Sequence, residues 1–295
     1  MNPESTLPGS AELIRDYSLE MTGKDVEELR AARETIPDGT RINVTFLGNE
    51  DLEMRVAAAR AVRESGFMPV PHIAARRIPS RAHLAEFLSR LHDVGAAQEV
   101  FVVGGDPASA EGPFEDAQSI IDSGLLEEYG VQGVTISGYP EGHPDITTAL
   151  LWRALDQKVA SLSHRGFHAT ILTQLAFDTA PVAEWIAATR SKGIEVDIRV
   201  GTPGPAGVKR LIGFARRFGI GANALIVKKY GFSLTNLMGT AGPDRFVDGL
   251  ADALALTPMK SDVKLHFYTF GGLRATSDWV HHYEARTRAN GADHG

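Results

Sequence analysis

Short apolar runs alternate with amphipathic stretches along most of the chain. Runs rich in Val, Ile, Thr and Phe predict strands near 17–21, 41–45, 68–72, 99–103, 132–137, 168–173, 195–201 and 263–269. Helical spacing of apolar residues predicts helices over 51–65, 83–94, 147–162, 182–192 and 208–218. Several of these end in a glycine, the usual residue after a helix (Gly66, Gly95, Gly193 and Gly219). The rhythm gives about eight βα units, which predicts a single (β/α)8 TIM barrel.

Two segments, residues 1–12 and 219–262, fall outside this regular alternation. The stretch 219–262 breaks the rhythm, and we expect extra helices there, near 224–230 and 244–256, before the last strand. Pro, Ser and Gly cluster in residues 1–12, which predicts a flexible N-terminal tail before one catalytic domain over 13–290. A doubly wound sheet is the structural alternative, but it usually carries a phosphate-binding loop after its first strand, and none is visible there.

Composition narrows the class of protein. The chain has 295 residues, a formal net charge of −7 and no cysteine. The negative charge argues against general binding to nucleic acid or anionic membranes. The lack of cysteine excludes thiolate catalysis and Cys-ligated metals. No signal-peptide pattern and no long apolar span is visible, so the cytoplasm is the expected location.

Polar residues recur at or just after the ends of the predicted strands. They are Glu20, Thr45, His72, Asp106, Tyr139, His143, Gln174 and the run His266 to Thr269. In a parallel barrel the carboxyl ends of the strands converge on one rim, where active sites are built. The pattern therefore indicates an enzyme.

Three of these positions have a functional and a structural interpretation. Glu20 lies between Leu19 and Met21, so it fits a general acid of raised pKa, an exposed strand residue or a partner to an arginine. The segment from Gly104 and Gly105 to Asp106 allows a ligand to approach the backbone, or is a plain turn. His143 is either a site residue or a cap for the next helix. The histidines lack metal-ligand spacing, and we expect no metal.

Taken together, these motifs resemble the methylenetetrahydrofolate reductase family, over about residues 13 to 285. The resemblance rests on Ser18 to Glu20, Pro71-His72, Gly105-Asp106, the Tyr-Pro-Glu-x-His-Pro run from Tyr139, Thr173-Gln174 with Phe177-Asp178, and His266 to Thr269. It implies a β/α barrel that reduces 5,10-methylenetetrahydrofolate to 5-methyltetrahydrofolate with NAD(P)H, usually through bound FAD. Members of this family supply methyl groups in one-carbon metabolism and methionine biosynthesis.

The resemblance also assigns roles to matched positions. Glu20 corresponds to the acid that protonates N10 of the folate, which opens the ring to a 5-iminium cation. Asp106 corresponds to the aspartate that binds the amino-pyrimidine edge of the pterin, and Gln174 and Tyr139 to further substrate contacts. The cofactor pocket of flavin-containing members corresponds to Thr45, His72, Gly104, Gly105, Tyr139, His143 and Lys158.

Several departures concern the flavin. Gly104 replaces an arginine before the Gly-Asp pair, and Leu151, Ala154 and Gln157 replace residues that hold the flavin ribose and diphosphate, so that only Lys158 remains. Each lost charge-assisted contact costs about 1.5–3 kcal/mol. We therefore expect direct hydride transfer from NAD(P)H, with NADH favoured, and no tightly bound FAD. Gly48, Gly104 and Gly138 are expected to leave room for the nicotinamide.

Alternatives to this function stay open. They are a conventional FAD-dependent reductase, a related oxidoreductase that uses another pterin or a deazaflavin, and a non-catalytic or methyl-transferring pterin-binding barrel. The expected partners are a tetrahydrofolate derivative and a nicotinamide nucleotide. Arg274, or Lys228 and Lys229, are candidates for the folate glutamate tail. The direction of the reaction and the oligomeric state are left undetermined.

Overall fold

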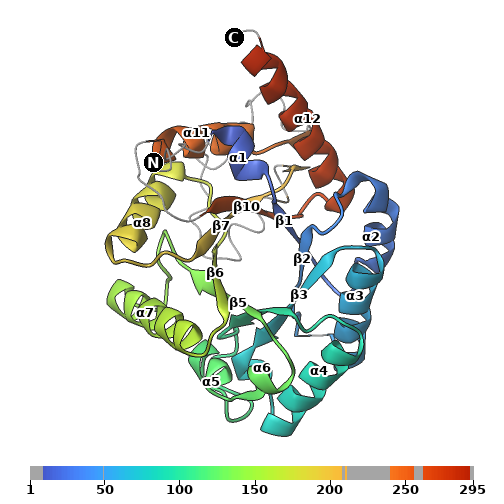
Figure 1. Ribbon diagram of the computed structural model, residues 1–295, viewed down its shortest axis with the longest axis vertical. Coiled ribbons are helices and arrows are strands. Elements are labelled where there is room, and N and C mark those ends of the chain that lie inside the picture. The colour runs from blue at the N-terminus through green and yellow to red at the C-terminus, as the bar shows by residue number, and fades with distance from the viewer. Residues whose placement is uncertain (1–8, 49, 208–209, 211–239, 256–261, 293–295) are drawn as a thin grey trace, which may run out of the picture. The chain divides into compact units, whose positions relative to one another are not determined.

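The fold is a closed barrel of eight parallel strands, seen in a computed structural model that describes residues 9–48, 50–207, 210, 240–255 and 262–292 (Figure 1). Around the barrel the strand order is β1, β10, β7, β6, β5, β4, β3, β2. The strands are β1 (Ser18–Met21), β2 (Arg41–Val44), β3 (Met68–Ala74), β4 (Glu99–Val103), β5 (Gly133–Gly138), β6 (His168–Thr173), β7 (Asp197–Pro203) and β10 (Val263–Tyr268). The predicted (β/α)8 barrel is confirmed.

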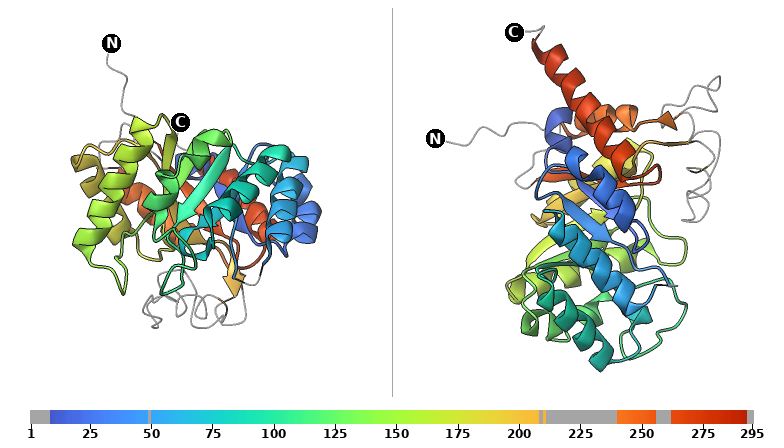
Figure 2. Two further views of the ribbon diagram at one scale, coloured as in Figure 1. Left: turned by 90° about the horizontal axis from the view of Figure 1, so that it is seen from below. Right: turned by 90° about the vertical axis from the view of Figure 1, so that its right-hand side faces the viewer.

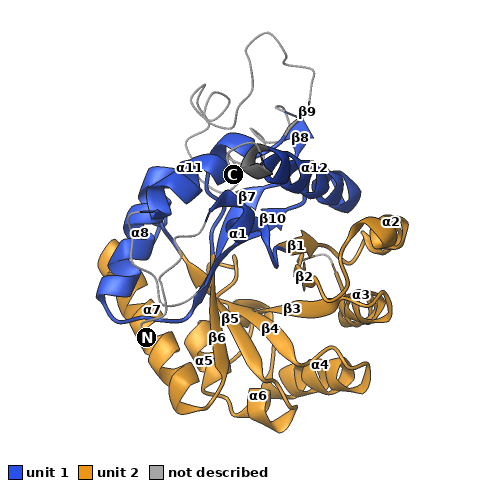
Figure 3. Ribbon diagram, turned by 45° about the horizontal axis from the view of Figure 1, so that its top comes forward, with its two compact units in different colours: residues 1–17, 139–147, 173–295 blue, residues 18–138, 148–172 orange. Residues whose placement is uncertain are grey.

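The chain divides into two compact units, which are coloured separately in Figure 3. One comprises residues 18–138 and 148–172, and we call it the β1–β6 unit. The other comprises residues 1–17, 139–147 and 173–295, and we call it the β7–β10 unit. Each unit is described by itself below.

In the β1–β6 unit, neighbouring strands are in a register that sets which side chains share a face. Glu20 is the Cα partner of Asn43, and Asn43 is the partner of Val70. His72 lies two residues beyond Val70 and pairs with Phe101 of β4. Because side chains alternate along a strand, Glu20, Asn43 and His72 point to the same face as Val70. Val70, Phe101 and Leu172 form an apolar cluster on that face.

Three helices of this unit begin at a residue whose side chain caps the first turn. The helices of the unit are α2 (Val26–Ala32), α3 (Leu52–Glu64), α4 (Arg81–Asp93), α5 (Ala117–Ile121), α6 (Leu125–Glu128) and α7 (Thr148–His164). Side chains of Asp51, Ser80 and Asp116 cap α3, α4 and α5 by accepting backbone N–H bonds. Helices α2, α3 and α4 pack side by side in sequence order (Figure 2).

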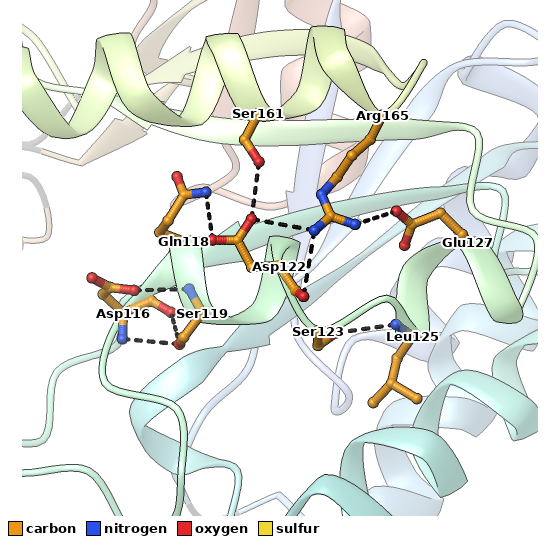
Figure 4. A network of polar contacts seen from close by, with 9 residues as sticks. All are labelled: Asp116, Gln118, Ser119, Asp122, Ser123, Leu125, Glu127, Ser161 and Arg165. Carbon is orange, nitrogen blue, oxygen red and sulfur yellow. Dashed lines mark hydrogen bonds and ion pairs between the residues drawn. The ribbon is translucent and has the colours of Figure 1, made fainter.

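A polar network joins α5, α6 and α7 (Figure 4). Arg165, one residue beyond α7, donates to Glu127 of α6 at 2.7 Å and to the carboxylate of Asp122 at 3.5 Å. Ser161 of α7 donates to the same Asp122 carboxylate at 3.0 Å. These are partly exposed contacts between elements far apart in sequence, and they fix the helices to one another.

In the β7–β10 unit, β10 pairs with β7 over its whole length, from Val263 with Ile198 to Tyr268 with Pro203. The helices of this unit are α1 (Ser10–Ile14), α8 (Thr179–Ser191), α11 (Asp244–Leu254) and α12 (Leu273–Ala292). Helix α1 packs against α11, α12 and β10. Two buried cations secure it, because Lys264 of β10 pairs with Glu12 and Arg199 of β7 pairs with Asp16.

All eight predicted strands are present, with ends that differ by at most a few residues. The glycines at 66, 95 and 193 have positive φ of 83°, 69° and 78°, as expected after a helix. The helix expected near 244–256 is α11, but those near 208–218 and 224–230, with Lys228, Lys229 and Gly219, lie outside the described residues apart from Arg210. The expected tail over 1–12 and the domain over 13–290 stay predictions. Residues 1–8 are outside the described part, and Ser10 to Glu12 form the first turn of α1.

No helix in the described part of the chain is both long and apolar enough to cross a membrane. Two short strands, β8 (Ala206–Gly207) and β9 (Thr240–Ala241), form a separate antiparallel pair, and single turns of 3-10 helix, η1 (Arg33–Thr35) and η2 (Ala75–Arg77), follow α2 and β3.

Candidate active site

Strand β1 places Glu20 beside a buried histidine. The Glu20 side chain is 19% exposed, and its Oε2 lies 3.9 Å from Nε2 of His72, whose side chain is 9% exposed. The amide Nδ2 of Asn43, on the strand between them, lies 3.4 Å from the same His72 nitrogen. The His72 ring meets Phe101 edge-on at 4.7 Å. Glu20 is therefore part of a confined polar cluster at the carboxyl ends of β1, β2 and β3.

Arg55 of α3 contacts this cluster through the backbone of His72. Its Nη2 donates to the carbonyl of His72 at 2.7 Å, and its guanidinium lies between the rings of Phe46 and Phe87, at 3.6 and 4.0 Å. Burial lowers the pKa of Arg55 to about 9, although the nearby Glu50 carboxylate favours the charged form. This cation holds the backbone of β3 in place at His72.

Glu50 connects the loops that follow β1 and β2. It is 5% exposed and accepts hydrogen bonds from the backbone N–H of Gly23 at 2.9 Å and of Leu47 at 3.2 Å. A Cβ at Gly23 would lie 2.8 Å from Met54 and 3.1 Å from Glu50, so a larger residue would require these side chains to move. Glu50 thus fixes the part of the chain that follows Glu20.

Asp106 lies in the loop after β4 and is held by an arginine. Nε and Nη2 of Arg77, in η2, donate to its two carboxylate oxygens, each at 2.8 Å. The Asp106 side chain is 76% exposed, whereas that of Arg77 is 20% exposed. The hydrogen bonds to Asp106 raise the pKa of Arg77 above its usual value. The pair therefore presents a bidentate contact at the rim, with the carboxylate on the outer side.

The loop after β2 accommodates Arg77. A Cβ at Gly48 would lie 2.4 Å from Nη1 of Arg77, so the guanidinium occupies the space beside this glycine. The expectation that Gly48 leaves room for a nicotinamide stays a prediction, and it requires this flexible arginine side chain to move. A Cβ at Gly104, by contrast, would meet no atom within 4 Å, and Gly105 has a φ of 94°, which favours glycine.

Two further predicted residues of this unit, Thr45 and Lys158, have contrasting surroundings. The hydroxyl of Thr45 is buried, and no hydrogen-bond partner for it occurs among the described residues. Lys158 lies on α7, where burial lowers its pKa to about 8, opposed by the charge of Asp116 at the start of α5. The Thr45 hydroxyl is thus buried and unsatisfied within the described part of the chain, and Lys158 is a cation held in surroundings that favour its neutral form.

In the β7–β10 unit, Gln174 follows a tightly packed strand end. The N–H of Gly201 donates to the hydroxyl of Thr173 at 2.9 Å, and the phenol of Tyr268 donates to the Thr173 carbonyl at 3.3 Å. A Cβ at Gly201 would lie 2.6 Å from that carbonyl and 2.7 Å from the Tyr268 ring. His266 meets the Tyr268 ring edge-on at 4.9 Å. These contacts fix the backbone that carries the half-buried Gln174.

Tyr139 and His143 meet within the loop after β5. Their rings pack edge to face at 5.6 Å. Nδ1 of His143 accepts the N–H of Asp145 at 3.1 Å, and Gly142 closes a turn onto the Tyr139 carbonyl at 3.1 Å. His143 therefore organises the loop that leads to α7, and its role as a site residue or as a helix cap stays a prediction.

The sequence indicated Glu20, His72 and Asp106 but not the residues that hold them. Arg77, Asn43, Arg55 and Glu50 were not expected to take part. The adjacent basic pair Arg76 and Arg77 directly after β3 is the signal that would have indicated one of them. In the described residues no group of three or more His, Asp or Glu side chains is arranged to hold a metal ion.

The fold and these strand-end clusters define a (β/α)8 barrel with polar groups at the carboxyl ends of its strands. No family model matches the chain. A dihydropteroate synthase from Thermus thermophilus is similar over 91% of this chain and 92% of its own, with 12% identity and a TM-score of 0.48. A D-psicose 3-epimerase, solved in the presence of D-fructose, is similar over 81% of this chain and 97% of its own, with 12% identity and a TM-score of 0.39. The function is therefore argued from the chain's own residues.

Proposed function

We propose that the chain is a methylenetetrahydrofolate reductase that transfers hydride between NAD(P)H and 5,10-methylenetetrahydrofolate, without tightly bound flavin. The observation that carries this proposal is the bidentate contact of Asp106 with Arg77. The N3–H and 2-amino group of a pterin form a cyclic guanidine, with two parallel N–H donors. Asp106 already accepts two such donors at 2.8 Å each, so its carboxylate has the geometry that a pterin edge requires.

Glu20 supports the reductase over a simple pterin binder. Binding alone does not require a second carboxyl group in a confined cluster, whereas opening the folate ring requires an acid. In the proposed step Glu20 protonates N10, the bond between N10 and the methylene carbon breaks, and a 5-iminium cation forms. Hydride from C4 of the nicotinamide then adds to the methylene carbon and gives the 5-methyl product. The Glu20 carboxylate left behind stabilises the cation.

The residues along α7 do not fit a flavin diphosphate. Leu151, Ala154 and Gln157 carry no charge, and Lys158 is a cation whose pKa is lowered to about 8 by burial. Accessible, positively charged donors bind a diphosphate most strongly. The open space beside Gly104 favours a ligand near the rim, but it does not compensate the charge of a diphosphate. We therefore route no step through a flavin.

The test is an absorbance spectrum of the purified protein, followed by NADH oxidation with methylenetetrahydrofolate, with and without added FAD. We expect no flavin bands and a rate that does not depend on FAD. Stoichiometric FAD, or activity only after its addition, would contradict direct transfer but leave the substrate assignment in place. A lack of turnover under all conditions, with no folate binding, would overturn the proposal as a whole.

A further inference from the structure

The cluster around Glu20 contains an imidazole with no role in the proposed reaction so far. Nε2 of His72 lies 3.9 Å from Oε2 of Glu20, which is longer than a hydrogen bond but within the range of an ion pair. Contacts of catalytic groups are often long in unliganded proteins and shorten when substrate binds. The two side chains are therefore close enough to exchange a proton after a small rotation.

Phe101, Arg55 and Asn43 are among the neighbours that set how His72 faces Glu20. Phe101 packs edge-on against the ring at 4.7 Å, and Arg55 holds the His72 carbonyl at 2.7 Å. Asn43 lies 3.4 Å from Nε2, the same nitrogen that faces Glu20. An amide offers either an N–H donor or a carbonyl acceptor, so Asn43 is able to satisfy Nε2 with or without a proton. The ring is thus held in one orientation in both of its charge states.

Each turnover of the proposed reaction consumes one proton together with one hydride. The proton must be on Glu20 when N10 of the folate is to be protonated. An ordinary glutamic acid, with a pKa of about 4.3, carries its proton in roughly one molecule in 500 at pH 7. An ordinary imidazole, with a pKa of about 6.5, carries one in roughly one molecule in four. An imidazole in contact with Glu20 would therefore make a proton available about 100 times more often.

We propose that His72 holds the proton that Glu20 delivers to the folate, so that the two side chains act as one singly protonated pair. This inference rests on the proposed function. The proton moves from Nε2 of His72 to the Glu20 carboxylate and from there to N10, while the bond from N10 to the methylene carbon breaks. His72 is left neutral and takes up a proton from water before the next turnover. His72 is a positioning residue, since it acts through Glu20 and is not required to touch the substrate.

The charges around His72 agree with this role. The contacts place Glu20 of β1 and Arg55 of α3 near it, while β2 and β4 face it with Asn43 and Phe101. Arg55 is a cation and disfavours a second positive charge, but Glu50 lies close to it and offsets its charge. The carboxylate of Glu20 is thus placed to stabilise a proton on His72.

The first test measures the titration of the His72 ring by NMR in the unliganded full-length protein, and requires no turnover. The resonance is assigned by its loss in His72→Gln. We expect the midpoint to fall by about one pH unit in Glu20→Gln, because the neutral amide no longer stabilises the imidazolium. A matched Glu99→Gln change, at the start of β4, should leave it in place. An unchanged midpoint in Glu20→Gln would overturn the shared proton whether or not the protein reduces folate.

The second test measures turnover of methylenetetrahydrofolate against pH. In His72→Gln we expect kcat to fall 10-fold to 100-fold at pH 8, with folate affinity within twofold of the wild type. The deficit should shrink toward pH 5, where Glu20 is protonated from water. A deficit that is equal at all pH values would indicate a merely structural role and contradict the proposal. If His72→Gln does not fold, Asn43→Leu provides the same readout, since it removes the group that holds Nε2 in place.

Discussion

Glu20 and Asp106 are both carboxylates at carboxyl ends of strands in the β1–β6 unit, and each lies next to a basic side chain. Glu20 is 19% exposed and faces a buried histidine at 3.9 Å, whereas Asp106 is 76% exposed and binds an arginine through two hydrogen bonds. A confined carboxyl group near a titratable partner is suited to proton transfer. An exposed carboxylate with a planar donor is suited to recognition, because its partner can be exchanged at little cost. The environment, and not the residue type, separates the two roles that we propose.

The surroundings differ for a structural reason. Glu20 belongs to a strand, so its direction is fixed by pairing with Asn43 on β2. Asp106 follows two glycines in a loop, and Arg76 holds that loop through the carbonyls of Glu115 at 2.9 Å and Pro107 at 3.2 Å. A strand therefore holds the proposed acid, Glu20, in a fixed direction, while a loop anchored by Arg76 carries the proposed binding carboxylate, Asp106.

The largest effect is expected from Glu20→Gln. The change keeps the shape of the side chain but removes the proton, so kcat should fall by about 100-fold to 10,000-fold while folate affinity changes less than twofold. Single-turnover kinetics and folate titration measure the two quantities separately. Glu99→Gln is the matched control and should behave as wild type. A parallel loss of folate affinity would mean that Glu20 binds the substrate as Asp106 is proposed to do. The proposed difference in role between the two carboxylates would then be wrong.

Asp106→Asn should mainly lower folate affinity and leave kcat nearly unchanged, the opposite of Glu20→Gln. An amide replaces one of the two acceptor oxygens with a donor, which costs about 1.5–3 kcal/mol, or roughly 10-fold to 150-fold in folate affinity. The chemical step in the bound state should change far less. Asp38→Asn is a suitable control, since Asp38 forms a similar exposed pair with Arg33 just before β2. Unchanged affinity in Asp106→Asn would remove this residue from the substrate site.

The same two carboxylates illustrate what the sequence alone can predict. The strands were predictable because apolar, β-branched runs of four to seven residues are separated by turn residues and amphipathic stretches. The positions of Glu20 and Asp106 at strand ends follow directly from those runs. Helices α5 and α6 were not predicted, since five and four residues are too few to show a helical period. Helix α12 was not predicted either, and its long polar surface explains why.

The partners of these carboxylates could not be predicted, because pairing depends on register and not on local pattern. His72 meets Asn43 across 29 residues and Arg77 meets Asp106 across a further 29. A shift of one residue in strand pairing would turn Asn43 to the other face of the sheet. The contact between Arg77 and Gly48 likewise depends on how two loops lie in space. The confined pair of Glu20 with His72 and the exposed pair of Asp106 with Arg77 are therefore known only from the structure.

Lys158 extends the comparison to a third charge and gives a pH-dependent prediction. Its pKa is lowered by burial from 10.5 to about 8, so the folded protein binds this proton more weakly than the unfolded chain does. Stability should therefore rise with pH between about 8 and 10.5, and the charged lysine is destabilising at pH 7. We expect Lys158→Met to raise the free energy of unfolding at pH 7 by on the order of 1–3 kcal/mol, toward the lower end because some of the side chain is exposed.

Urea unfolding at pH 7 and at pH 10 measures this effect. The gain in Lys158→Met should be clear at pH 7 and smaller at pH 10, whereas Lys24→Met, at an exposed position, should change neither value. A loss of stability at pH 7 would show that Lys158 is stabilised by its environment. The effect of burial on the charge of Lys158 would then be smaller than that of its favourable contacts.

The smallest effect is expected from Arg77→Met. Whether the KM for folate falls or rises in this variant tests whether Arg77 competes with the pterin for Asp106. If the guanidinium occupies the oxygens that the pterin needs, removing it should lower the KM for folate and leave kcat unchanged. An exposed ion pair contributes about 0.2–1 kcal/mol, so the decrease should not exceed roughly fivefold. Arg76→Met is the matched control, and it should raise KM, because Arg76 holds the loop through backbone carbonyls. A higher KM in Arg77→Met would show that Arg77 orients Asp106 for the substrate, and recognition at this rim would then depend on a fixed pair rather than an exchangeable one.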